Sequence, residues 1–249
     1  MLPVTHGQLL DAKYLLGLIS LVGIGADDAY VALKDSFPGV IPISQGSSEC
    51  LVIYTGSRII IVYQGTKDAT DLLRDIDIPK IRVSGGRVHR GFAEAYRQIE
   101  DRMLSAVSSL NPDRVIPVHV TGHSLGGAMA LQSIVALKSR GHLVTDSIIF
   151  GCPRVGDATW AETFNSLGVQ VVHFLHNLDI VPALPPFLGY KAVGTPVYID
   201  DAGNMWPKRK LSIKLLMVAW WAWIFRIPEA HLLKGYIPAI SAAITRNRL

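Results

Sequence analysis

The stretch VIPVHVTGHSLGGA, from Val115 to Ala128, decides how the rest of this sequence is interpreted. Its first residues, Val115 to Val120, predict a buried strand, and a helix is predicted from Leu125 to Ser139. Between them, Gly122 to Gly126 has the pattern G-x-S-x-G. In a strand–turn–helix context this pattern places Ser124 on a strained turn with its hydroxyl above the sheet. The alternative is an ordinary turn whose serine only caps the helix.

The pattern on either side of this turn predicts an α/β protein with a mostly parallel sheet. Near-continuous apolar strands that alternate with helices are typical of a parallel sheet covered by helices on both faces. Leu51–Tyr54 and Arg58–Tyr63 predict a hairpin, which gives the sheet an antiparallel edge. We predict one domain over residues 1–249. The other expected strands are Thr145–Phe150, Val169–Phe174 and Val197–Asp200, and the other helices are Gln8–Ser20, Ala26–Ser36, Gly91–Leu110, Ala158–Leu167 and a helical C-terminal end interrupted at Pro228.

Composition excludes a disordered chain, because 49% of the 249 residues are hydrophobic and 18% are charged. No apolar run reaches the roughly 18 residues of a membrane-spanning helix. The net charge of +4 is uneven: residues 205–249 hold eight Lys and Arg against Glu229, giving +7, and the rest carries −3. A basic end that contains tryptophan favours an anionic or lipid-interface partner over nucleic acid. The alternative is a solvated basic face.

The cysteines and the N-terminus bear on the cellular compartment. Two cysteines, Cys50 and Cys152, are too few for a disulfide framework, so we expect buried free thiols. Asp11 lies where a signal peptide is positively charged, and Asp27 closely follows the apolar run Tyr14–Ala26. We interpret this run as a helix packed on the core. This favours an intracellular protein and leaves secretion open.

A nucleophilic serine needs a base, and partners in this arrangement follow in the order serine, acid, histidine. His231 is the candidate base because acids precede it, whereas His173 is expected to be a core residue within a strand. Asp179 is the candidate acid because a short loop separates it from the strand Val169–Phe174. It therefore lies beyond the carboxyl end of a strand, where α/β folds build their sites. Asp157 is the second candidate, and a capping role is the alternative for Asp179.

Two backbone donors are expected to stabilise an oxyanion beside Ser124. The amide of Leu125 lies at a helix N-terminus, which favours developing negative charge. The loop Gln64–Thr66 follows the second hairpin strand, and there Gly65 permits close backbone approach while Thr66 offers an N–H and a hydroxyl. Two such donors stabilise a transition state by several kcal/mol.

Six motifs occur together in an order that resembles the class 3 lipases, the fungal-type triacylglycerol lipases of the α/β-hydrolase fold. They are Tyr63–Thr66, Val88–Phe92, Thr121–Ala128, Phe150–Asp157, Asn177–Pro182 with Leu184–Pro186, and His231 with Tyr236. The resemblance covers roughly Leu51 to Tyr236.

The resemblance implies an α/β-hydrolase fold and ester hydrolysis by a triad of Ser124, Asp179 and His231. It implies Thr66 and Leu125 as oxyanion donors, places Asp157 in a structural motif, and implies a lid between Thr66 and His89, here Thr70 to Arg87. The chain departs from the family at Gln64, where members usually carry arginine.

The predicted function is therefore a serine ester hydrolase that cleaves acylglycerol-type esters through an acyl-enzyme. The alternatives are a phospholipase A1-type or short-chain carboxylesterase activity at the same site, or a non-catalytic lipid-binding module. The expected partner is a lipid ester substrate, with peripheral contact at a lipid interface. No metal cluster or phosphate-binding loop is recognisable in the sequence, so we expect no cofactor, and no nucleic acid is expected as a partner.

The segment Leu211–Phe225 is apolar except for Lys214 and carries Trp220, Trp221 and Trp223. As a helix it would measure about 22 Å, short of the roughly 30 Å of a hydrocarbon core. Tryptophans with basic flanks suit a membrane–water interface. The alternatives are a buried core helix or a wall of the acyl-chain pocket. We predict that these tryptophans, together with His123 beside Ser124, bind substrate.

Overall fold

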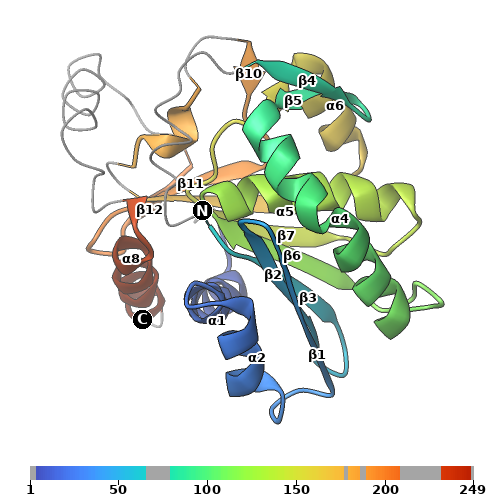
Figure 1. Cartoon of the computed structure of the whole chain (residues 1–249). Helices are drawn as coiled ribbons and strands as arrows, with labels where there is room; N and C mark the ends of the chain where they lie inside the picture. The colour runs from blue at the N-terminus through green and yellow to red at the C-terminus, as the bar shows by residue number, and fades with distance from the viewer. Residues whose placement is uncertain (1–3, 66–78, 177–178, 186–188, 208–230, 248–249) are drawn as a thin grey trace.

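The computed structural model describes residues 4–65, 79–176, 179–185, 189–207 and 231–247 (Figure 1). In this part of the chain, eight strands form one sheet in the order β1-β2-β3-β6-β7-β9-β11-β12. The consecutive pairs from β3 to β11 are parallel, and the pairs at the two edges are antiparallel. This confirms the mostly parallel sheet with an antiparallel hairpin. The strands are β1 (Gly39–Gln45), β2 (Ser48–Tyr54), β3 (Ile59–Tyr63), β6 (Val118–His123), β7 (Asp146–Phe150), β9 (Gln170–His176), β11 (Thr195–Ile199) and β12 (Met205–Trp206).

Helices cover both faces of this sheet, as predicted (Figure 1). One face packs against α1 (His6–Val22), α2 (Ala26–Leu33) and α8 (Leu233–Arg246), and the other against α4 (Arg90–Leu110) and α5 (Leu125–Ser139). Successive residues of β3 show this arrangement, because Ile60 and Val62 join the core on the α1 and α8 face while Ile59, Ile61 and Tyr63 join the core beneath α4 and α5. Every residue of β3 is fully buried, which explains its continuous apolar sequence.

A second, smaller sheet was not predicted from the sequence. Its described strands follow the order β10-β8-β5-β4, namely Tyr190–Lys191, Gly156–Asp157, Gly86–His89 and Lys80–Val83, and β5 and β8 pack against α6 (Ala158–Ser166). Two of these strands have only two residues, too short for a period-2 pattern. Of the segment in which the resemblance implies a lid, Thr70 to Arg87, residues 80–83 and 86–87 belong to this sheet. Residues 70–78 lie outside the described residues.

Strand β1 was also missed, because Pro42 and several half-exposed residues obscure its pattern. Proline is tolerated there because β1 is an edge strand. A two-residue turn with Gly46 at φ +62° joins β1 to β2.

The boundaries near the site differ from the prediction in a way that matters. Strand β6 begins at Val118. Val115, where the strand was predicted to begin, is 69% exposed. The strand ends at His123, the residue before Ser124.

The C-terminal end is helical as predicted, whereas Pro228 lies outside the described residues. Cys50 and Cys152 are buried free thiols, as expected. No helix in the described ranges is long and apolar enough to cross a membrane.

Candidate active site

Ser124 occupies a strained turn between β6 and α5. Its φ of +56° and ψ of −123° are unusual for a residue with a side chain, and such strain is concentrated at functional sites. The glycines of the motif allow the turn to form: a Cβ on Gly122 would overlap the carbonyl of Gly126, and one on Gly126 would lie 2.6 Å from the carbonyl oxygen of Tyr63. A Cβ on Gly127 would lie 2.9 Å from Cβ of Cys152. The G-x-S-x-G-G sequence therefore corresponds to a turn held by close backbone contacts.

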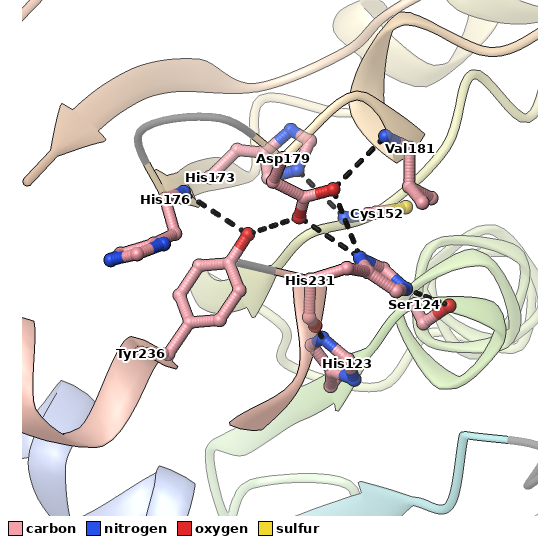
Figure 2. Close-up of polar contacts among 9 residues, drawn as sticks. All are labelled: His123, Ser124, Cys152, His173, His176, Asp179, Val181, His231 and Tyr236. Atoms are coloured by element: carbon pink, nitrogen blue, oxygen red, sulfur yellow. Dashed lines mark hydrogen bonds and ion pairs between the residues drawn. The ribbon is translucent and has the colours of Figure 1, made fainter. Parts of the chain in front are cut away.

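The structure brings Ser124, His231 and Asp179 together in one hydrogen-bonded chain (Figure 2). Nε2 of His231 lies 2.8 Å from Oγ of Ser124. Nδ1 of the same ring lies 3.0 and 2.9 Å from the two carboxylate oxygens of Asp179. All three side chains are buried, and they come from the residue after β6, the loop after β9 and the position two residues before α8. This geometry suits a nucleophile, a base and an orienting acid.

The carboxylate of Asp179 has two further donors. The backbone N–H of Val181 donates to Oδ1 at 3.0 Å, and the hydroxyl of Tyr236 donates to Oδ2 at 2.5 Å. Burial acts to raise the pKa of this carboxyl, but His231, by charge and hydrogen bond, and the Tyr236 hydroxyl outweigh burial and hold the pKa below its usual range. Asp179 is therefore ionised at neutral pH, as an acid that orients a histidine must be.

Tyr236 is a site residue whose role the sequence did not reveal. Its side chain is fully buried, and its hydroxyl accepts a hydrogen bond from the backbone N–H of His176 at 3.1 Å while it donates to Asp179. The available signal was its place five residues after His231, since a buried tyrosine hydroxyl needs a partner.

Gly151 is a second residue that was missed. It follows β7 with φ +53°, and a Cβ there would lie 2.8 Å from Oδ2 of Asp179 and 2.9 Å from the hydroxyl oxygen of Tyr236. The backbone therefore passes directly against the acid, and no side chain fits without displacing it.

His123 lies below His231 in the view of Figure 2. Its Nε2 is 2.6 Å from the backbone carbonyl of His231, and the two rings are 4.7 Å apart. Burial, followed by the nearby charge of His231, lowers the pKa of His123 to about 3. The ring is therefore neutral, and to bond a carbonyl it must carry its proton on Nε2. These contacts give His123 a role in holding His231, and its predicted contact with substrate stays a prediction.

The two competing residues have structural partners. Oδ1 of Asp157 accepts from the backbone N–H of Trp160 at 2.9 Å, which caps α6, and from that of Arg87 at 3.2 Å. His173 is buried in β9 as expected, and its Nε2 accepts from the backbone N–H of Cys152 at 3.0 Å.

Part of the predicted site falls beyond the described residues. Leu125, the first residue of α5, lies where first-turn amides have no partner within the helix. The other predicted oxyanion donor, Thr66, and the tryptophans Trp220, Trp221 and Trp223 lie outside the described residues. Gly65, just before Thr66, lies against the nucleophile turn, since a Cβ on it would be 2.9 Å from the carbonyl oxygen of His123.

Comparison with known proteins identifies the family of the chain. The family model for class 3 lipases matches residues 60–189, more than half of the chain. The chain belongs to the class 3 lipase family. A lipase from Rhizomucor miehei is 32% identical over 170 residues, which are 64% of this chain and 44% of that protein. Phospholipase A1-II 4 from Oryza sativa subsp. japonica is 27% identical over 173 residues, covering 57% and 43%.

This class 3 chain thus spans less than half the length of the two curated relatives. Its fold matches that of a fungal lipase solved with an inhibitor, with a TM-score of 0.71 at 21% identity over 97% of this chain and 98% of the other. The fold is therefore the α/β-hydrolase fold that the motifs implied.

The hydroxyl of Tyr236 provides a prediction about stability. Tyr236→Phe removes one donor from a buried carboxylate, so we expect the free energy of unfolding to fall by about 2 kcal/mol at pH 7. Because folding lowers the pKa of the Asp179 carboxyl, this group stabilises the folded state at pH values above its ordinary pKa. That stabilisation is lost as the pH falls through the pKa of the folded state. The difference between variant and wild type should therefore shrink at acidic pH. Urea unfolding at several pH values measures it.

A control for this measurement is Tyr54→Phe, which removes an exposed hydrogen bond from the tyrosine hydroxyl to the carbonyl of Gly56. We expect it to change the unfolding free energy little at any pH. Equal effects of the two substitutions would contradict the role given to Tyr236.

Proposed function

We propose that this protein hydrolyses carboxylic esters of the acylglycerol type through an acyl-enzyme on Ser124. The observation that carries the proposal is the hydrogen-bonded chain from Oγ of Ser124 through His231 to Asp179. His231 would take the proton of Ser124 as Oγ attacks the ester carbonyl, and would return it to the leaving alcohol. Water would then cleave the acyl-enzyme, with His231 again acting as base. The amide of Leu125 would donate to the oxyanion in both steps.

Phospholipase A1-type cleavage is the second candidate, because a curated relative carries that name and the same triad chemistry would serve both ester classes. A non-catalytic lipid-binding module has less support. Such a module needs no serine held in a strained turn against a hydrogen-bonded histidine, and this chain has both.

A substrate panel tests the proposal. Wild-type protein and Ser124→Ala would be assayed on p-nitrophenyl esters, on triglyceride and diglyceride emulsions, and on phospholipid vesicles. Release of fatty acid from glycerides that depends on Ser124 supports an acylglycerol hydrolase. Preferential release from phospholipid favours the second candidate. Binding to lipid without Ser124-dependent release on any substrate would contradict both.

We further propose that the acyl site opens toward a lipid interface. Two large apolar side chains are exposed close to site residues: Leu232, 39% exposed, directly follows His231, and Ile24, 61% exposed, follows Gly23, whose carbonyl contacts Gln64. The basic flanks and tryptophans of Leu211–Phe225 support the same arrangement, although this segment lies outside the described residues.

Replacement of Trp220, Trp221 and Trp223 by serine tests this proposal. If they border the acyl site, hydrolysis of long-chain esters and emulsions should fall far more than that of soluble acetate esters, because each buried methylene contributes about 0.8 kcal/mol. If the segment is instead a buried core helix, the same substitutions should lower the melting temperature and reduce activity equally on both ester classes. Activity on both ester classes, measured beside the melting temperature, decides between them.

A further inference from the structure

The turn that follows β3 is tied to the N-terminal helices, which are distant in sequence. The backbone N–H of Gln64 donates to the carbonyl of Glu49 at 3.1 Å and so extends the β2–β3 pairing past the end of β3. The side-chain Nε2 of Gln64 donates to the carbonyl of Gly23 at 3.3 Å. Gly23 is the C-cap of α1, so this bond joins the turn to the corner between α1 and α2.

Glu49 holds the same corner from the opposite direction. Its Oε2 accepts from the backbone N–H of Ala26, the first residue of α2, at 2.8 Å. The N-cap of α2 is Gly25, which has no side chain to cap the helix, so the Glu49 carboxylate takes that role. Glu49 thus contacts Gln64 through its backbone and α2 through its side chain. It therefore fixes the corner between α1 and α2 to which the Gln64 side chain is hydrogen-bonded.

On its other side the turn lies against the nucleophile turn at backbone contact distance. A Cβ on Gly126 would lie 2.9 Å from the carbonyl oxygen of Gln64, and one on Gly65 would lie 2.9 Å from that of His123. These are contacts between main chains with no side chain between them to absorb a shift. Movement of the Gln64–Gly65 backbone would therefore change its spacing from the backbone around Ser124.

We propose that Gln64 is a positioning residue for the ester hydrolysis proposed above, on which this inference rests. Its amide fixes the Gln64–Gly65 backbone against the nucleophile turn, using the α1–α2 corner and Glu49 as the support. Oxyanion donors act only within a few tenths of an ångström of their productive distance, so a loosened turn slows the chemical step with little effect on substrate binding. The first two helices thereby contribute to the site without contacting substrate.

The test is Gln64→Met, which keeps the length of the side chain and removes its donor. We expect kcat on a soluble short-chain ester to fall about tenfold while KM changes less than about twofold. Gln64→Arg keeps an N–H donor and should retain activity near that of the wild type. The matched control is Gln98→Met, which removes a side-chain bond to the backbone N–H of Ser47 and should leave kcat unchanged.

Inhibition by a trifluoromethyl ketone separates positioning from general loss of structure. This probe adds to Ser124 as a tetrahedral oxyanion, so its inhibition constant should rise in Gln64→Met in parallel with the loss of kcat/KM. The melting temperature should fall no more than in Gln98→Met. If Gln64→Met does not fold, Gln64→Asn, whose amide is one methylene too short to reach Gly23, takes its place.

Wild-type kcat and inhibitor affinity in Gln64→Met, while Ser124→Ala is inactive, would overturn the role of Gln64 and leave the proposed function standing. A loss in Gln64→Arg equal to that in Gln64→Met would also overturn it, because the donor would then be irrelevant. Hydrolysis that survives Ser124→Ala would instead overturn the proposed function.

Discussion

Ser124→Ala should reduce ester hydrolysis by about four to six orders of magnitude, because loss of the nucleophile removes the covalent route entirely. The residual rate would come from the oxyanion donors and substrate binding. The substitution removes one oxygen from a turn whose shape depends on glycines, so we expect the fold to persist. Steady-state kinetics on a p-nitrophenyl ester and a glyceride measure the effect, and circular dichroism checks the fold.

The matched control is Ser133→Ala. Ser133 is a buried serine of α5, the helix that follows Ser124, and its hydroxyl donates to the carbonyl of Ala130 at 2.8 Å. The Ser133→Ala variant should be less stable than the wild type and should keep its turnover rate. Turnover near the wild-type rate in Ser124→Ala would remove Ser124 from the mechanism.

Asp179→Asn should lower kcat by about 10⁴-fold with the fold retained, because an amide no longer selects the tautomer of His231 that accepts the proton of Ser124. The site makes this effect specific: both carboxylate oxygens lie within 3.0 Å of Nδ1 of His231, and Val181 and Tyr236 hold them in place. Kinetics and thermal unfolding of the purified variant measure the two consequences separately.

Asp157→Asn is the control for Asp179→Asn, since Asp157 was the competing acid and the structure places it at the N-cap of α6. It should leave kcat close to that of the wild type and lower the free energy of unfolding by at most about 1 kcal/mol. If Asp157→Asn abolished turnover and Asp179→Asn did not, the acid would have to be reassigned.

Local patterns predicted the main sheet because its strands are buried on both faces and read as apolar runs. Ile59 to Tyr63 is of this kind, and the glycines around Ser124 identify a turn that tolerates no side chains. Strand β1 and the second sheet were missed for the opposite reason. Strand β1 is half-exposed and the strands of the second sheet have only two to four residues, so neither leaves a periodic signal in the chain.

The three proposed catalytic residues were found because their chemistry and their order along the chain limit the choices. The residues around them depend on tertiary contacts. Nothing local to Tyr236 or Gly151 indicates that both lie against the carboxylate of Asp179, because β7, β9 and α8 meet there only in the folded chain. The contact of His123 with the backbone of His231 shows the same limit, since the sequence showed only its position beside Ser124.

Covalent trapping tests the central claim, that Ser124 is the nucleophile of an ester hydrolase activated by His231. Purified protein would be incubated with a p-nitrophenyl alkylphosphonate, and the intact mass, the released nitrophenol and the modified peptide would be measured together. We predict one phosphonyl group per chain, on the peptide that contains Ser124, with activity lost in proportion and labelling strongly slowed in His231→Ala. Full loss of activity with the label on another residue, or continued hydrolysis by a protein labelled stoichiometrically at Ser124, would contradict the account.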